Sequence, residues 1–192
     1  MTAAIEQELV DRARQADPAA TAALLARLRP GIVRYCRARL GRVGGAYTTA
    51  DDVAQEVCLA LLRAVPRYRD EGRPFAAFVY GIAAHKVADA QRAAVRDPEP
   101  APVDTLADHP DAAPGPEQQA VRTDVARRLS GLLAQLPEPQ REIILLRVAV
   151  GLPADEVGAI VGMSAPAVRV AQSRALARLR TLAGDGLGEV AA

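Results

Sequence analysis

The sequence predicts an all-α protein: two small helical domains joined by a flexible, acidic, proline-rich linker, the second domain containing a helix-turn-helix. Apolar residues recur at spacings of three and four, and β-branched residues almost never alternate with polar ones, which favours helices over strands. A stretch without this periodicity, residues 97–116, separates two regions that have it. Half of the 192 residues are apolar, which is enough to bury a core on either side of that stretch.

The first domain is expected to span residues 1–96 and to contain five helices. Asp17 and Pro18 separate the first two, because aspartate can cap a helix that proline then opens. Thr49 followed by Asp52 resembles a capping box at the start of the fourth helix, which Pro66 ends. The expected helices are residues 5–16, 18–29, 31–40, 50–64 and 75–95.

Charge is segregated along the chain, although the net charge is only +1. Residues 1–96 carry a net charge of +5, residues 97–116 carry −5, and residues 117–192 carry +1. The middle segment holds six prolines, five acids and no basic residue, so it cannot bury enough apolar surface to order itself. We expect a linker there and not a loop packed inside one domain, because long structureless segments are uncommon in a compact fold.

The second domain is expected to span residues 117–183, followed by a glycine-rich tail at 184–192 that frays. Its apolar spacing predicts a helix that stops before Pro137. Another helix is expected to open near Pro139 and to end at Gly151, because glycine breaks a helix.

The strongest functional signal is a pair of expected helices, about residues 154–161 and 165–182, with a bend at Gly162 and Ser164 as N-cap. Two helices joined by such a short turn form a helix-turn-helix. Residues 164–182 contain four arginines and no acid, and arginine on a recognition helix can pair with guanine in the major groove. The alternative is an ordinary amphipathic helix with a solvated basic face. The candidate duplex-contacting residues are Ser164, Arg169, Val170, Ser173, Arg174 and Arg178.

A second signal lies on the helix expected at residues 50–64. Its core stripe is Val53, Val57, Leu61 and Val65, and its opposite face carries Asp52, Gln55, Glu56 and Leu59. An exposed leucine among acids suggests a docking surface for a partner helix. An ordinary solvated face is the alternative, since scattered surface leucines are normal.

Arginine and aromatic residues are mixed in residues 67–75, just ahead of the helix that carries His85 and Lys86. Four of the six aromatic residues fall within thirteen positions there, which suggests stacking on the bases of a single strand. The alternative is a small core cluster, which we favour for Phe78 and Tyr80. The candidates for single-strand contact are Arg73, Phe75, His85 and Lys86.

Composition argues against several other classes of protein. The two cysteines, Cys36 and Cys58, and two histidines are too few for a disulfide framework, a zinc site or an acid–base active site. No apolar run approaches the roughly 18 residues that span a bilayer, and the acidic N-terminus lacks the order of a signal peptide. We therefore expect a cytoplasmic protein that is not an enzyme, has no cofactor or metal, and does not insert into membranes.

Four motifs follow one another in an order that resembles a known family. They are Asp51-Asp52-Val-Ala-Gln55-Glu56, then Phe75-Ala-Ala-Phe78-Val-Tyr80-Gly-Ile82-Ala, then Leu136-Pro137-Glu-Pro-Gln140-Arg141-Glu142, and Gly151-Leu152 leading into Gly162-Met-Ser164…Val168-Arg169. Together they resemble the sigma-70 family of bacterial transcription initiation factors, and most of all its short extracytoplasmic-function group. The resemblance covers roughly residues 8–96 and 117–182.

The resemblance implies a sigma factor that binds core RNA polymerase and directs promoter-specific initiation. In that family the first domain docks on the clamp helices of the polymerase's largest subunit and melts the minus-ten promoter element, and the second reads the minus-thirty-five element as duplex. By position, the Asp52–Leu59 face would meet polymerase, the loop 67–75 would hold a flipped base, His85 and Lys86 would face the minus-ten element, and the arginine face would read the minus-thirty-five bases. Whether an anti-sigma factor is a further partner stays open.

The sequence departs from the family pattern at five positions. Phe78 stands where the family usually has Trp, Gly81 where Arg is common, His85 where Asn or Gln is frequent, Pro153 where a Ser cap is usual, and Ala171 where a further Arg is common. Promoter sequence preference therefore does not transfer from the family. Two other functions remain as alternatives: a free-standing helix-turn-helix regulator that binds an operator without polymerase, and a helical adaptor that holds only a partner protein.

Overall fold

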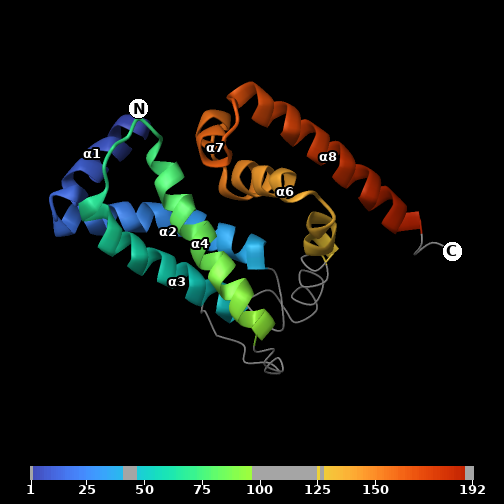
Figure 1. Cartoon of the computed structure of the whole chain (residues 1–192), viewed down its shortest axis with the longest axis horizontal. Helices are drawn as coiled ribbons and strands as arrows, with labels where there is room; N and C mark the ends of the chain where they lie inside the picture. Colours follow the sequence, from blue (N-terminus) through green and yellow to red (C-terminus); the bar gives the residue numbers. More distant parts are fainter. Residues whose placement is uncertain (1, 41–46, 97–124, 126–127, 189–192) are drawn as a thin grey trace, which may run out of the picture.

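The computed structural model describes residues 2–40, 47–96, 125 and 128–188, and all regular structure in these ranges is helical. In chain order the elements are α1 (Thr2–Arg14), α2 (Pro18–Leu40), α3 (Tyr47–Ala64), η1 (Val65–Arg67), α4 (Phe75–Arg96), α6 (Glu138–Ile144), η2 (Leu145–Val150), α7 (Ala154–Val161) and α8 (Ala165–Gly188) (Figure 1). Residues 128–134 are also helical. The all-α prediction is confirmed, whereas the predicted linker at 97–116 lies outside the described residues.

The junction between α1 and α2 is built around Asp17. Its carboxylate accepts hydrogen bonds from the backbone N–H groups of Ala19 at 2.9 Å and Ala20 at 3.2 Å, which are donors that a helix leaves free in its first turn. The Arg12 guanidinium lies 2.7 Å from the same carboxylate and, with those N–H groups, lowers the pKa of Asp17. Asp17 is therefore the N-cap that the sequence predicts.

Helix α2 is continuous, so the prediction of separate helices at 18–29 and 31–40 is wrong. Pro30 lies inside it and removes one backbone hydrogen bond, which by itself favours a break. Leu24 before the proline and Ile32 after it are both fully buried. Packing on both sides of Pro30 outweighs its local preference, as tertiary context often does.

Two helix boundaries also differ from prediction. Helix α3 begins at Tyr47, so Thr49 lies inside it and is not the N-cap of a capping box. Helix α8 continues to Gly188, so residues 184–188 are helical and not part of a frayed tail. Helix ends depend on only a few hydrogen bonds, so the sequence predicts the end of a helix less accurately than its middle.

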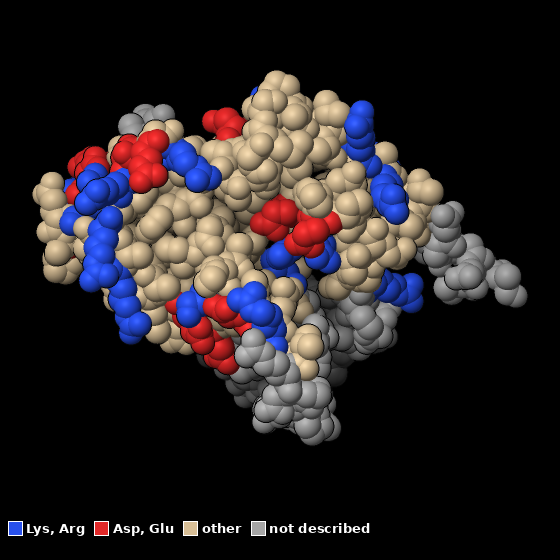
Figure 2. All heavy atoms as spheres, in the orientation of Figure 1, with Lys and Arg blue, Asp and Glu red and all other residues tan. Residues whose placement is uncertain are grey.

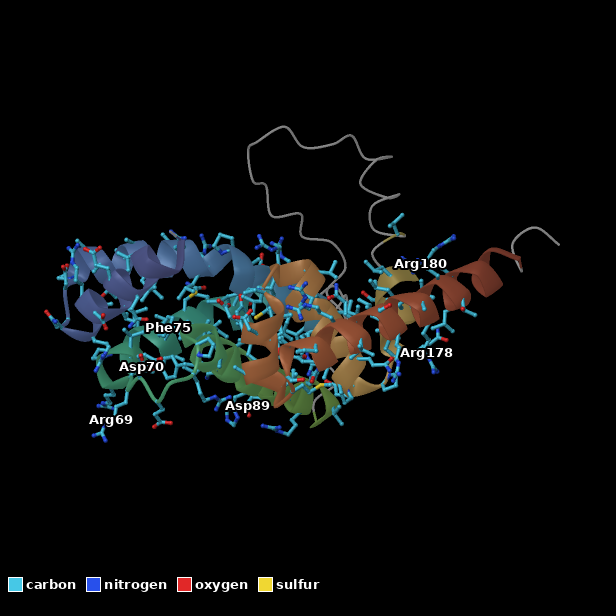
Figure 3. All side chains as sticks on the ribbon, turned by 90° about the horizontal axis from the view of Figure 1, so that it is seen from above. Arg69, Asp70, Phe75, Asp89, Arg178 and Arg180 are labelled. Carbon is cyan, nitrogen blue, oxygen red and sulfur yellow. The ribbon has the colours of Figure 1, made fainter. Side chains whose placement is uncertain are left out.

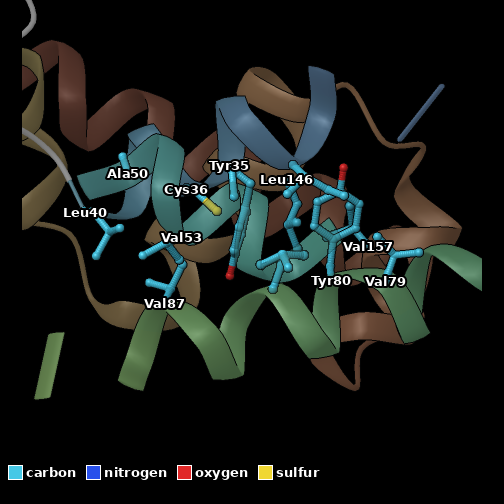
Figure 4. Packing of buried hydrophobic residues seen from close by; sticks show 14 of the residues in the cluster. Tyr35, Cys36, Leu40, Ala50, Val53, Val79, Tyr80, Val87, Leu146 and Val157 are labelled. Atoms are coloured by element: carbon cyan, nitrogen blue, oxygen red, sulfur yellow. The ribbon is translucent and has the colours of Figure 1, made fainter. Parts of the chain in front are cut away.

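Helices α2, α3 and α4 surround the largest group of buried side chains (Figure 4). The predicted core stripe of α3 is confirmed: Val53, Val57, Leu61 and Val65 are all buried. Tyr80 on α4 is only 4% exposed, and its ring meets that of Tyr35 edge to face, with centroids 5.5 Å apart. The favoured core role of Tyr80 is therefore confirmed.

The C-terminal helices pack directly on this bundle. Leu146 of η2 and Val157 of α7 belong to the same buried cluster as Tyr35 and Tyr80 (Figure 4). A smaller cluster joins α6 to α8 and consists of Leu133, Leu136, Ile144, Leu145 and Ala175. The two helical groups expected from the sequence are present, and they share a core that the sequence did not predict.

Candidate nucleic-acid interface

Helices α7 and α8 form the predicted helix-turn-helix. The turn includes Gly162, whose φ of 73° is the left-handed conformation that glycine adopts without strain, and Met163. Ser164 follows, and its hydroxyl accepts a hydrogen bond from the Ala167 N–H at 3.4 Å. The bend glycine and the serine N-cap are both confirmed.

Gly158 allows the turn to fold back closely onto α7. A Cβ at this position would lie 2.4 Å from the Met163 carbonyl oxygen, a backbone atom that cannot move without opening the turn. We expect Gly158→Ala to lower the free energy of unfolding by about 1–3 kcal/mol, the usual cost of overpacking a core.

Thermal denaturation checks this expectation, with Gly81→Ala as its control. Nothing lies within 4 Å of a Cβ built at Gly81, so alanine in the middle of α4 should stabilise the protein by about 0.5–1 kcal/mol. If both variants melted at the same temperature, the close approach at Gly158 would not affect the free energy of unfolding.

The outward face of α8 carries the predicted duplex-contacting residues. Val168 and Ala175 are fully buried on its inner side, while Val170 is left 49% exposed. Basic side chains lie over α8 in Figure 2 without acidic ones beside them, in keeping with the absence of acids in residues 164–182. All six candidates are exposed: Ser164, Arg169, Val170, Ser173, Arg174 and Arg178.

Arg147 holds this recognition helix in place, a role that the sequence analysis missed. Its guanidinium donates hydrogen bonds to the Gln172 side-chain oxygen at 2.9 Å and to the Leu152 carbonyl oxygen at 2.5 Å. These bonds tie η2 both to α8 and to the segment that leads into α7. No local signal reveals such a residue, because Gln172 lies 25 positions further along the chain.

The predicted docking face of α3 is exposed as a whole. Asp52, Gln55 and Glu56 are solvent-accessible, and Leu59 is 48% exposed. Leu62, which the sequence analysis did not select, is 45% exposed and three positions further along. Residues three apart are neighbours on a helix surface, so the face has an apolar centre flanked by acids.

Lys86 links the α3 face to α4. Its ammonium lies 3.2 Å from the Glu56 carboxylate. Lys86 is a predicted contact for DNA and Glu56 a predicted contact for polymerase, so this ion pair joins the two candidate surfaces. His85 beside it has a side chain that is 76% exposed, with the Asp89 carboxylate 3.7 Å away. The two candidate surfaces therefore adjoin along α3 and α4.

The loop between η1 and α4 lines an open cavity of about 320 Å³. Its walls are Arg67, Tyr68, Arg69, Glu71, Arg73, Pro74, Ala77 and Phe78. Phe75 packs behind them, with its ring centroid 5.0 Å from that of Tyr68 and 5.7 Å from that of Phe78. Figure 3 shows Arg69 and Asp70 at the outer edge of the molecule and Phe75 further inward. Phe75 thus supports the two aromatic walls of the cavity and does not line it.

The tip of the loop before α4 and the C-terminal part of α8 lie toward opposite ends of the molecule. Arg69 and Asp70 are near one end of its long axis, and Arg178 and Arg180 are near the other (Figure 3). Arg73, which also lines the loop cavity, reaches toward the helix-turn-helix, because its guanidinium donates a hydrogen bond to the carbonyl oxygen of Ala159 on α7 at 2.6 Å. Within the described ranges, no three His, Cys, Asp or Glu side chains are grouped as a metal site, and no helix is long and apolar enough to cross a membrane.

Comparisons with known proteins match both helical groups. Residues 24–97 match Sigma-70 region 2, and residues 126–179 match Sigma-70, region 4. Over 178 residues, 91% of this chain and 93% of the relative, the sequence is 55% identical to the ECF RNA polymerase sigma factor ShbA of Streptomyces griseus. The chain belongs to the ECF sigma factors. The resemblance noted from its four motifs is thereby confirmed.

Further comparisons agree with this family. The ECF RNA polymerase sigma factor SigD of Mycobacterium tuberculosis is 58% identical over 165 residues, which are 84% of this chain and 77% of the relative. The solved structure of CnrH in complex with the cytosolic domain of CnrY has the same fold, with a TM-score of 0.69 at 24% identity over 94% of this chain and 98% of that one. This ECF sigma factor therefore directs RNA polymerase to initiate transcription at specific promoters.

Proposed function

We propose that this sigma factor divides promoter recognition between its two helical groups. Helix α8 reads the minus-thirty-five element as duplex, and the loop before α4 captures an unpaired base of the minus-ten element. The observation that carries the proposal is the exposed, acid-free face of α8 in a serine-capped helix-turn-helix. Arginines on such a face pair with the O6 and N7 atoms of guanine.

The minus-ten assignment is supported by the shape and charge of the loop cavity. A volume of about 320 Å³ accommodates a nucleobase, and Tyr68 and Phe78 offer aromatic walls. Stacking of a base on an aromatic side chain contributes about 1–3 kcal/mol, which offsets part of the cost of unstacking it from the duplex. Arg69 and Arg73 supply positive charge for the phosphates beside a captured base. His85, exposed on α4, adds a contact on the upstream side.

The α3 face docks on core RNA polymerase, at the clamp helices of the largest subunit. An exposed pair, Leu59 and Leu62, flanked by acidic and amide side chains supports this assignment. An apolar centre with a polar rim is the surface that one helix presents to another.

The protein acts by binding and not by catalysis, in the cytoplasm. A further protein partner, an anti-sigma factor, is supported by CnrH, which has the same fold and was solved in complex with the cytosolic domain of CnrY.

Run-off transcription on a library of genomic fragments tests the proposal. Core polymerase with this chain should give discrete transcripts that core polymerase alone does not, and their start sites should share two sequence elements. A single shared element would contradict the division of recognition.

A further inference from the structure

Glu71 is the one acid among the described residues that line the loop cavity. Base stacking engages the aromatic walls and the phosphates engage the arginines, which leaves this carboxylate without a partner. A carboxylate repels the phosphates of a strand that lies beside it, because like charges repel. Its place in a cavity for a captured base is therefore unfavourable unless it contacts the base itself.

A tight turn holds Glu71 at the wall of the cavity. The Asp70 carboxylate accepts a hydrogen bond from the Gly72 backbone N–H at 2.9 Å, and this bond closes the turn around Glu71. Asp70 itself does not line the cavity. Burial raises the pKa of Tyr68, and the charges of Asp70 and Glu71 raise it further, in keeping with a carboxylate close to the aromatic wall.

The charged groups of the cavity do not satisfy one another. In the part of the chain that the structure describes, the side chains of Glu71, Arg67 and Arg69 are exposed and form no hydrogen bond or ion pair. The cavity therefore offers one free acceptor group and two free donor groups next to an aromatic wall. The edge of a nucleobase carries donors and acceptors side by side and is complementary to such a set. A phosphate, which only accepts, is not.

The four bases differ in what they offer to a carboxylate. An ionised carboxylate only accepts hydrogen bonds, so it needs an N–H group opposite it. Cytosine, adenine and guanine each carry an exocyclic amino group, and the pairing of a carboxylate with the cytosine amino group recurs in protein–DNA contacts. Thymine has no amino group, and its single ring N–H lies between two carbonyl oxygens. Those oxygens would face the carboxylate and repel it.

We propose that Glu71 selects the base that the loop captures: its carboxylate accepts a hydrogen bond from an exocyclic amino group and rejects thymine. Arg67 donates to an acceptor on the edge of the same base. This inference rests on the proposed capture of a minus-ten base in the cavity, and it adds which bases the cavity takes. A charged acceptor that loses water without gaining a donor destabilises the wrong complex more than one missing hydrogen bond would.

The test compares holoenzymes that contain the native chain or the Glu71→Gln variant. Fluorescence anisotropy measures binding of labelled single strands with the minus-ten sequence of a promoter identified by run-off transcription, with each of the four bases placed in turn at every position. Glutamine keeps the shape of glutamate, and its amide can donate to a carbonyl oxygen of thymine.

Two further variants separate the possible causes of a change. Asp70→Asn is the matched control, because it removes the same charge one residue away and asparagine can still accept the hydrogen bond from Gly72. Arg69→Ala reports whether the loop holds the strand at all, since loss of a phosphate contact weakens binding of every strand about equally.

The native holoenzyme should disfavour thymine about tenfold at one position of the element. Glu71→Gln should remove this preference there, and Asp70→Asn should keep it; the base bound most tightly by the native chain identifies the ligand as cytosine, adenine or guanine. A native preference for thymine at that position, or the same change with Asp70→Asn, would overturn the selection by Glu71.

The remaining outcomes distinguish this inference from the function on which it rests. Unaltered base preferences in Glu71→Gln, with every strand weakened by Arg69→Ala, would overturn the role of Glu71 and leave base capture by the loop standing. Native affinity for every strand in both Glu71→Gln and Arg69→Ala would show that the loop does not hold the strand, and the minus-ten assignment would fail with it.

Discussion

Arg174→Ala should weaken closed-complex formation at a promoter by about 1–3 kcal/mol, or about 5- to 150-fold, the discrimination that one arginine–guanine contact supplies. Arg174 is exposed on α8 beside Ala175, which is fully buried and fixes the orientation of the helix. The effect should depend on sequence and be largest at promoters that carry guanine at the contacted position.

Footprinting of the holoenzyme on duplex promoter DNA measures this loss. Arg180→Ala is the control on the same helix, because Arg180 is exposed six residues further along, about 9 Å nearer the C-terminal end. Arg180→Ala should lower affinity only slightly and equally at all promoters. The same sequence-dependent loss in both variants would contradict the assignment of base contact to Arg174.

The double substitution Gln55→Ala with Glu56→Arg should weaken binding to core polymerase by about 1–3 kcal/mol, as expected when central contacts of an interface are removed. Both residues are exposed, so the helix should stay folded. Loss of the Glu56–Lys86 ion pair is a small term, because exposed ion pairs contribute little.

Gln7→Ala with Glu8→Arg is the matched control for docking. Both residues are exposed on α1, and they are a glutamine followed by a glutamate, as Gln55 and Glu56 are on α3. Titration of labelled sigma factor with core polymerase compares the two double variants. Native affinity in the α3 variant, or equal weakening in both, would show that polymerase docks elsewhere.

Local signals were sufficient to predict the helix-turn-helix. A bend glycine, a serine cap and a set of arginines without acids lie close together in the sequence. The glycine and the serine determine the conformation of the residues next to them, so the motif can be predicted from local sequence. The bounds of α7 agree with the prediction, as does the exposed face of α8. The exposed face of α3 was predicted for the same reason, since its core stripe follows one helical period.

Contacts between distant parts of the chain were not predictable. Pro30 argues for a break in α2, and only burial on both of its sides keeps the helix continuous. The hydrogen bond from Arg73 to Ala159 spans 86 positions, so no local pattern encodes it. Phe75 was selected as an aromatic residue near arginines, but its packing behind Tyr68 and Phe78 depends on how the loop folds.

We propose that α8 acts on duplex and that the loop with His85 acts on strands that are already separating. His85→Ala is a cleaner probe of the second surface than Phe75→Ala, because His85 is exposed and Phe75 supports an aromatic cluster. His85→Ala should leave duplex binding by the holoenzyme near normal and slow promoter opening. A template with a pre-melted minus-ten bubble removes the unstacking cost and should restore much of the rate.

Permanganate reactivity of unpaired thymines, followed over time on duplex and pre-melted templates, is the most direct test. The pre-melted template should rescue open-complex formation by His85→Ala and should help Arg174→Ala far less, because Arg174 acts before strand separation. Equal rescue of both variants, or rescue of neither, would contradict the division of promoter recognition between the two surfaces.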